Sequence, residues 1–191
     1  MAAPTVELRP VQPEDKDRLL AWRNSPEVAG YMYTDHQITP EEHARWFGSI
    51  DGDVRRAYWI ITLDGAPVGL ANLYDIDRRN GRCAWAYYLA EPQVRGKGVG
   101  GYVEYLVIER VFGEFGLTKL WCEVLESNRA VWRMHLKFGF KEEARLRRHV
   151  LKNGVMEDVL GLGLLPEDWA EARPRIRETL AASGYPLADQ A

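Results

Sequence analysis

The chain has 191 residues and a formal net charge of −3, and 46% of its residues are hydrophobic. This length suits one domain, and the apolar fraction is sufficient for a core, which excludes general disorder. The negative charge argues against nucleic acid as the main partner, because nucleic-acid-binding domains usually carry a basic balance or a dense basic stripe. We therefore expect a single domain over residues 1–191.

The N-terminal segment and the apolar runs give no sign of export or of a membrane. Residues 1–5 lack the charged and apolar regions of a secretory signal. No run approaches the roughly 18–20 continuous apolar residues of a membrane span. The two cysteines, Cys83 and Cys122, and the four histidines show no metal-ligand spacing. These features predict a cytoplasmic protein without membrane contact, with reduced thiols and with no metal site.

Hydrophobic periodicity and turn residues divide the first half of the chain into a strand, two helices and three strands. The expected elements are a strand at 5–9, helices at 13–23 and from Pro40 with Thr39 as N-cap, and strands at 57–62, 68–74 and 82–89. Asp64-Gly65 and residues 77–81 mark the turns between these strands. Residues 27–37 form a loop or short helix with many aromatic and polar side chains.

The second half continues as helix, strand, helix, two strands and helix. These elements are expected at about 99–112, 119–125, 128–138, 144–151, 155–164 and 166–183. Residues after Ser183 are expected to fray. The final helix, with Trp169, could pack on the core or on a second subunit, so a homodimer stays open. The element order predicts a mixed α/β domain with a central sheet.

Glycines cluster at the start of the helix that follows the 82–89 strand, in the segment Arg95-Gly96-Lys97-Gly98-Val99-Gly100-Gly101. A helix start offers unpaired N–H groups and the positive end of its dipole, and glycine lets the backbone approach an anion closely. The segment therefore predicts a phosphate cradle, and an ordinary flexible loop is the alternative. A dinucleotide-binding loop would follow the first strand instead, and the P-loop pattern is absent.

Two motifs resemble the signatures of the GNAT acetyltransferase superfamily. The first is Arg95-x-x-Gly98-x-Gly100, which matches R/Q-x-x-G-x-G/A. The second is Asn128-x-Ala130-x-x-x-x-His135-x-Lys137-x-Gly139-Phe140, and a helix and a strand separate the two. The resemblance implies the GNAT fold, a mixed and mostly antiparallel sheet of about seven strands that is splayed in the middle and flanked by helices.

The resemblance also implies acetyl-CoA as co-substrate and assigns its contacts. Pantetheine would bond to the backbone of Tyr88, Leu89 and Ala90, the pyrophosphate to the N–H groups of Arg95, Gly96, Lys97, Gly98, Val99, Gly100 and Gly101, and Asn128 would meet the pantetheine arm or thiol. A backbone N–H at Tyr88 or Leu89 would polarise the thioester carbonyl. His135 stands where the family usually has an acid tyrosine, so we expect it either to protonate the leaving thiolate or to contact CoA or pack.

Glu123 is the candidate base. It lies in the apolar strand Leu120-Trp121-Cys122-Glu123-Val124-Leu125. Burying a carboxylate without a partner is costly, so its side chain should face the cleft or be paired. It could accept the proton of the amine or bind the incoming ammonium, and the alternative is a structural carboxylate paired with an arginine.

The N-terminal third of the chain is expected to determine the specificity for the acceptor substrate. Residues 22–28, 31–36 and 38–47 together resemble the amino-sugar N-acetyltransferases of pseudaminic acid biosynthesis. That resemblance implies acetylation of the 4-amino group of UDP-4-amino-4,6-dideoxy-N-acetyl-β-L-altrosamine, a precursor used in flagellin glycosylation. The expected contacts to UDP and sugar are Arg23, Met32, Tyr33, His43, Phe47, Tyr87 and Glu123. Alternatives are a ribosomal-protein or peptide N-terminal acetyltransferase, an aminoglycoside-modifying enzyme and a non-catalytic acyl-CoA-binding sensor.

Overall fold

A computed structural model describes residues 3–94, 96–185 and 187 of the chain. One seven-stranded sheet has the strand order β1-β2-β3-β4-β5-β7-β6. The strands are β1 (Val6–Pro10), β2 (Ala57–Leu63), β3 (Ala66–Asp77), β4 (Arg82–Leu89), β5 (Lys119–Leu125), β6 (Lys141–Lys152) and β7 (Val155–Leu164). The helices are α1 (Lys16–Asn24), α2 (Pro26–Ala29), α3 (Pro40–Gly48), α4 (Val99–Glu109), α5 (Arg129–Lys137) and α6 (Pro166–Ala182). The fold class and the element order expected from the sequence are confirmed.

Two hairpins have turns of the same kind, the first of which the sequence predicts. Asp64 and Gly65 have φ of 51° and 78° between β2 and β3, and Asn153 and Gly154 have φ of 49° and 78° between β6 and β7. Left-handed backbone at both central residues matches the twist of the flanking strands. Strand β6 begins three residues before the expected Ala144, because Lys141 and Glu142 already pair with β7.

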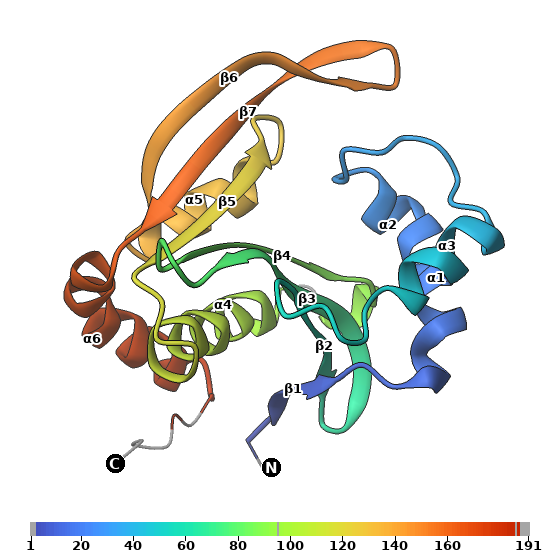
Figure 1. The fold of residues 1–191 in the computed structure, drawn as a ribbon. Coiled ribbons are helices and arrows are strands. Elements are labelled where there is room, and N and C mark those ends of the chain that lie inside the picture. The colour runs from blue at the N-terminus through green and yellow to red at the C-terminus, as the bar shows by residue number, and fades with distance from the viewer. Residues whose placement is uncertain (1–2, 95, 186, 188–191) are drawn as a thin grey trace.

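The sheet opens between β4 and β5, its one parallel pair among the strands described. Only Arg82–Ala84 and Lys119–Trp121 pair across this junction, and the remainder of β4 and β5 has no ladder between them. Figure 1 shows the two strands diverging from this point, with the β6–β7 hairpin arching above the gap. The splayed sheet expected from the family resemblance is therefore present.

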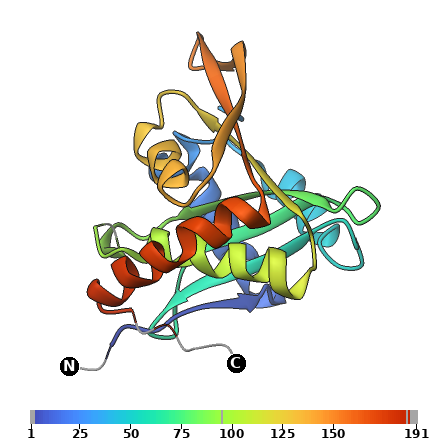
Figure 2. The same cartoon turned by 90° about the vertical axis from the view of Figure 1, so that its left-hand side faces the viewer.

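Helices cover both faces of the sheet. Helices α4 and α6 lie side by side across one face, and α1, α2 and α3 lie on the other (Figures 1 and 2). Side chains of β4 alternate between these layers, as in any strand. Trp85 and Tyr87 pack in the α4–α6 core, whereas Tyr88 and Ala90 pack with α1 and α3. The α4–α6 layer and the α1–α3 layer therefore lie on opposite faces of the sheet, and the gap between β4 and β5 has one face toward each layer.

The segment that follows α6 packs against the glycine-rich loop through Tyr185. The Tyr185 side chain is 1% exposed, and its ring stacks on that of Tyr102 at 4.9 Å. The expectation of a frayed tail after Ser183 is wrong for Tyr185 and for Leu187, which packs against the core. Residues 186 and 188–191 lie outside the described residues. No helix in the described part is long and apolar enough to cross a membrane.

Candidate active site

The glycine-rich loop forms an open cradle at the start of α4. Gly96 and Gly98 have φ of 74° and 76°, and Gly98 is the N-cap of α4 without a side-chain cap. The first-turn N–H groups of α4 therefore have no side-chain acceptor at the cap. A Cβ on Gly98 would lie 3.2 Å from the ring of Tyr185, and one on Gly100 would lie 3.1 Å from the hydroxyl of Tyr87. This cradle suits a phosphate group held by backbone N–H groups.

Hydrogen bonds place two other residues assigned to the cofactor, Lys97 and Ala90. Arg95 lies outside the described residues, whereas Lys97 is exposed and its carbonyl accepts a hydrogen bond of 2.6 Å from Tyr185. The N–H of Ala90 donates to Val68 on β3. Because backbone direction alternates along a strand, the N–H of Leu89 points to the unpaired side, toward β5.

Tyr33 and Glu123, which are 90 residues apart in sequence, meet on the α1–α3 face of the gap. The Tyr33 hydroxyl donates to Glu123 Oε2 at 2.7 Å. Burial and this hydrogen bond raise the pKa of Tyr33, so the phenol stays a donor. Ala86 is exposed although it lies inside the central strand β4, beyond the last residue that pairs with β5. The geometry can bind an ammonium group or remove its proton.

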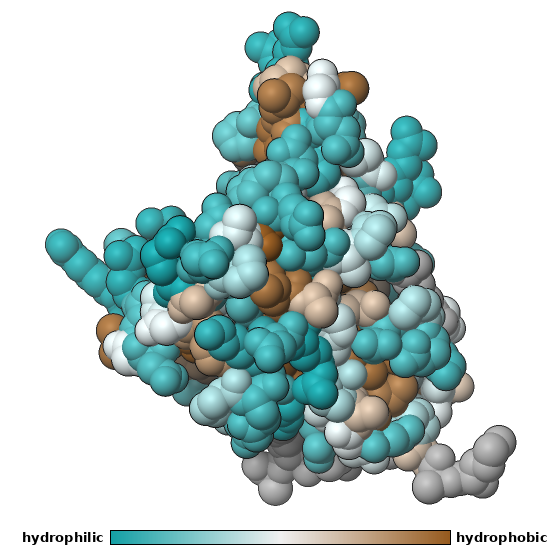
Figure 3. All heavy atoms as spheres, turned by 90° about the vertical axis from the view of Figure 1, so that its right-hand side faces the viewer, coloured by the Kyte–Doolittle hydropathy of each residue, from teal (hydrophilic) through white to brown (hydrophobic). Residues whose placement is uncertain are grey.

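Tyr74 adds a second phenol to this face. Burial raises the pKa of Tyr74 to about 12, and the charge of Glu123 contributes to the shift. The ring of His149 on β6 lies 6.5 Å from that of Tyr33. Figure 3 shows this side of the molecule, where apolar surface lies among hydrophilic side chains at the centre and recurs near the top. Tyr33 thus connects the carboxylate to the β6–β7 hairpin.

Lys152 fixes the loop that carries Tyr33. Its side chain is buried, and its ammonium donates to the carbonyls of Ala29, Met32 and Thr34 at 2.7, 2.7 and 3.1 Å. Charge-assisted hydrogen bonds of this kind are stronger than neutral ones. The β6–β7 hairpin therefore holds the segment after α2 in place.

Replacing Lys152 with methionine is expected to release this loop. Three carbonyls would lose their donor, so amides of residues 29–35 should exchange hydrogen at least about 10-fold faster. Hydrogen-exchange mass spectrometry checks the expectation, with Lys137→Met on the exposed end of α5 as the control. Unchanged exchange in residues 29–35 would show that Lys152 does not order the loop.

Several residues that we expected to bind the acceptor lie beneath the surface of the α1–α3 face. The Arg23 guanidinium donates to the Thr34 hydroxyl, and burial lowers the pKa of Arg23. His43 is 4% exposed, and its Nε2 lies 2.7 Å from the Lys16 carbonyl.

The remaining residues that we expected to bind the acceptor also lie away from Glu123. Met32 and Phe47 pack in the core beneath α1 and α3. Tyr87 lies on the opposite face of the sheet, stacked on Trp85 at 5.4 Å. Of the residues expected to bind the acceptor, Tyr33 and Glu123 share a hydrogen bond, and His43 and Phe47 are in ring contact at 6.0 Å behind the face.

His135 belongs to a buried polar cluster between α4, α5 and β5. Its Nδ1 lies 2.8 Å from Glu104 Oε1, and the two side chains are 3% and 0% exposed. Burial alone would lower the pKa of His135, but Glu104 and Cys122 outweigh it and raise the pKa to about 10. Burial raises the pKa of Glu104. This placement favours a packing role for His135, which was the second role considered. The His135–Glu104 pair joins α5 to α4 beside the gap.

Sequence reasoning did not single out Glu104, Lys152 or Tyr74. Glu104 had a usable signal, since it is the one carboxylate among the apolar residues 99–108. Lys152 had no usable signal, because its three partners are backbone carbonyls that lie 118 to 123 residues away in the sequence. Among the described residues, no group of three or more His, Cys, Asp or Glu could hold a metal ion.

Known proteins share this architecture. The acetyltransferase (GNAT) domain model matches residues 5–141. The SPbeta prophage-derived uncharacterized N-acetyltransferase YokL of Bacillus subtilis (strain 168) is 33% identical over 111 residues, which cover 57% of this chain and 61% of YokL. The putative ribosomal N-acetyltransferase YdaF of the same organism is 23% identical, with 86% of this chain and 93% of YdaF covered. The first of these matches thus spans about three fifths of its relative's length.

Solved structures agree with the fold. The spermidine N-acetyltransferase from Vibrio cholerae, crystallised with CoA and spermine, superposes with a TM-score of 0.81 at 18% identity, covering 86% of this chain and 98% of that one. These relatives are named for polyamine, ribosomal or unidentified acceptors, and none of the three is named for an amino sugar. The family model covers well over half of the chain, including both motifs up to Phe140, and the splayed sheet and glycine cradle agree with it. The chain belongs to the GNAT acetyltransferase family.

Proposed function

We propose that the chain transfers an acetyl group from acetyl-CoA to a primary amine, and that the acceptor is a UDP-linked 4-amino-4,6-dideoxy sugar. The observation that carries the proposal is the Tyr33–Glu123 pair, at 2.7 Å, on the α1–α3 face of the gap. The glycine cradle lies at the start of α4, on the other face. Donor and acceptor would meet where β4 and β5 diverge.

The residues of the cradle fit a CoA pyrophosphate. Positive φ at Gly96 and Gly98 and the uncapped start of α4 present N–H groups to an anion. Residues 98–101 would hold the pyrophosphate, and the N–H of Leu89 would bond to the carbonyl oxygen that gains negative charge. Acetyl-CoA would supply the acetyl group as an activated thioester.

Glu123 performs the proton chemistry in this proposal. An ammonium group cannot attack a carbonyl, so the carboxylate first accepts one of its protons. The neutral amine would then attack the thioester carbon, the C–S bond would break, and the second proton lost by the nitrogen would end on the CoA thiolate. Tyr33 keeps the carboxylate oriented through its hydrogen bond. In this proposal the His135–Glu104 hydrogen bond joins α4 to α5, and neither residue takes part in the chemistry.

The acceptor class rests on the resemblance of residues 22–47 to amino-sugar acetyltransferases and on charge. An open hollow on the β6–β7 hairpin is lined by Arg147, Arg148 and His149, and the His149 ring lies 6.5 Å from that of Tyr33. The two arginines attract phosphate and repel a polycation such as spermidine. A peptide N-terminus carries the same reactive amine and gains nothing from this charge. The three acceptor classes are therefore separable by experiment.

Thiol release from acetyl-CoA tests the function directly. The protein is incubated with the UDP-linked 4-amino sugar, with a short peptide that has a free N-terminus, or with spermidine, and free CoA is quantified. The proposal predicts release with the UDP sugar at least about 100-fold above the other two amines. Release with the peptide or spermidine alone would overturn the acceptor, and no release with any amine would overturn acetyl transfer.

Replacing Gly98 with alanine is expected to weaken CoA binding about 10-fold. The new Cβ would strain a backbone with φ of 76° and press on the Tyr185 ring, so the cradle must shift. Gly116→Ala is a matched control, because Gly116 has φ of 62° but nothing within 4 Å of its Cβ position. Calorimetric titration with CoA compares the two, and equal affinities would exclude the cradle from cofactor binding.

A further inference from the structure

The β6–β7 hairpin contains an irregularity that neither strand pairing nor the turn requires. Leu146 pairs with Val159 and Val150 pairs with Glu157, so three residues of β6 face the single residue Asp158 of β7. The three residues that bulge out are Arg147, Arg148 and His149, and we name them the basic bulge. Bulges re-aim side chains and are frequent beside active sites.

The backbone of the basic bulge is strained and held by a specific bond. Arg148 has φ of 50°, a left-handed conformation that is unfavourable for a residue with a long side chain. Its N–H donates to Asp158 Oδ1 at 2.7 Å, which holds this conformation. Strain of this sort is found where a structure positions functional groups.

Two guanidinium groups of this region have no partner in the part of the chain that the structure describes. Arg145, at the edge, forms ion pairs with Glu126 and Glu142. Arg147 and Arg148 are exposed, and neither side chain forms an ion pair or hydrogen bond within residues 3–94, 96–185 and 187. The fork of N–H donors on arginine matches the oxygens of a phosphate group.

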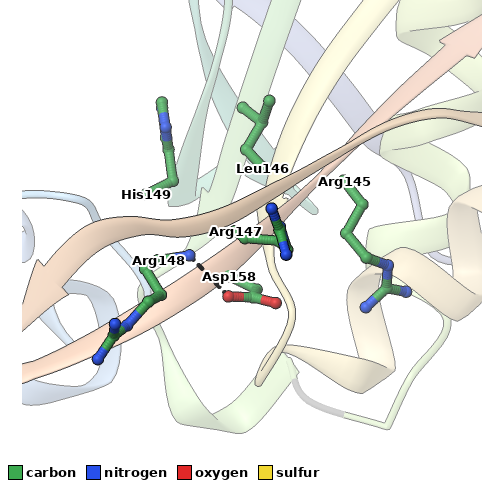
Figure 4. A pocket seen from close by; sticks show the side chains of 6 residues that line it. All are labelled: Arg145, Leu146, Arg147, Arg148, His149 and Asp158. Atoms are coloured by element: carbon green, nitrogen blue, oxygen red, sulfur yellow. Dashed lines mark hydrogen bonds between the residues drawn. The ribbon is translucent and has the colours of Figure 1, made fainter.

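The basic bulge lines a hollow that is large enough for a phosphate-bearing ligand. The hollow has a volume of about 800 Å³, is open to solvent, and is lined by residues of β6 together with Asp158. In Figure 4, Arg147, Arg148 and Asp158 project to one side of the hairpin, and His149 and Leu146 to the other. Asp158 contributes one negative charge against the two arginines, so the balance is positive.

His149 connects this hollow with the candidate active site. Its ring lies 6.5 Å from the ring of Tyr33, whose hydroxyl binds Glu123. The basic bulge therefore touches the candidate active site through His149, while Arg147 and Arg148 project to the other side of the hairpin. Arg23, the residue expected from the sequence to bind phosphate, is occupied by Thr34.

We propose that the basic bulge is a phosphate-binding subsite of this enzyme. Two sources of the phosphate fit the chemistry, the diphosphate of a nucleotide-linked acceptor and the 3′-phosphate of CoA. The choice of the acceptor as one source rests on the proposed function, whereas the binding of phosphate itself does not.

Calorimetric titration of the full chain tests the subsite without requiring turnover. The ligands are inorganic pyrophosphate, UDP, CoA and dephospho-CoA, and the proteins are wild type and the double variant Arg147→Ala/Arg148→Ala. Loss of two charge-assisted contacts is expected to weaken phosphate binding by about 10- to 100-fold. Arg79→Ala, an exposed arginine in the turn between β3 and β4, is the matched control and should bind within about two-fold of wild type.

The pattern of losses identifies the source of the phosphate. Weaker binding of UDP and pyrophosphate with unchanged CoA supports an acceptor subsite, and weaker binding of CoA with unchanged dephospho-CoA supports a site for the 3′-phosphate. Equal affinities of the double variant and wild type for all four ligands would overturn the proposal. If UDP binding depends on the bulge but no UDP-amino sugar is acetylated, the subsite stands and the proposed function fails.

Discussion

Replacing Glu123 with alanine is expected to lower kcat/KM for amine acetylation by about 10²- to 10³-fold, the range of a lost general base. The carboxylate is the group on the α1–α3 face that can take the proton of the ammonium, and it is oriented by Tyr33 at 2.7 Å. Steady-state rates with saturating acetyl-CoA measure the loss. The affinity for CoA should not change, because the cradle lies at the start of α4, across the sheet from this side chain.

Tyr33→Phe is the matched control for this substitution. It removes the hydrogen bond to Glu123 and keeps the carboxylate and the ring, so a loss of only about 10-fold is expected. Glu123→Gln separates the roles further, because it keeps an acceptor for Tyr33 but cannot accept a proton, so its loss should match that of Glu123→Ala. A Glu123→Ala variant with wild-type kcat/KM would exclude this residue as base and as ammonium ligand.

Replacing His135 with phenylalanine is expected to lower the free energy of unfolding by about 3–5 kcal/mol at neutral pH. The change leaves Glu104 with 0% exposure and without its partner, and breaking a buried pair from one side is strongly destabilising. Burial raises the pKa of Glu104, so stability is retained at low pH and lost as the pH rises through that value. Urea unfolding should show a smaller deficit at about pH 5 than at about pH 7.5.

The double variant Glu104→Leu/His135→Phe tests the cause of this loss. Removing both partners leaves no buried charge, so it should recover much of the stability that His135→Phe loses. If the single variant is as stable as wild type, the pair does not hold α4 and α5 together. If the single variant is folded yet loses turnover by more than about 100-fold, His135 acts in the chemistry as the resemblance to the family acid implies.

The fold could be predicted almost completely from local patterns. Asp64-Gly65 carries a turn signal that needs no tertiary context and forms the expected hairpin, and Asn153-Gly154 forms a turn of the same kind between β6 and β7. Thr39 and Glu42 form a reciprocal capping box at the start of α3, where Thr39 was expected as the N-cap. The start of β6 was missed because Lys141 and Glu142 are polar and pair by their backbone alone.

The candidate site was predictable where a local sequence pattern places the residue, as in the glycine-rich loop and at Glu123 in its apolar strand. Gly98 and Gly100 occupy the cradle because the loop itself requires them. The partners of Arg23 and His43 are Thr34 and the Lys16 carbonyl, and nothing local in the sequence specifies either contact. The basic bulge depends on a shift of register between β6 and β7, which periodicity cannot show.

A crystal structure of the complex with CoA and the UDP-linked 4-amino sugar tests the central claim most directly. The account predicts that the acceptor nitrogen lies within hydrogen-bonding distance of the Glu123 carboxylate, about 3 Å, with CoA pyrophosphate on the N–H groups of residues 98–101. An acceptor nitrogen bound away from Glu123, or a pyrophosphate bound away from the start of α4, would contradict it.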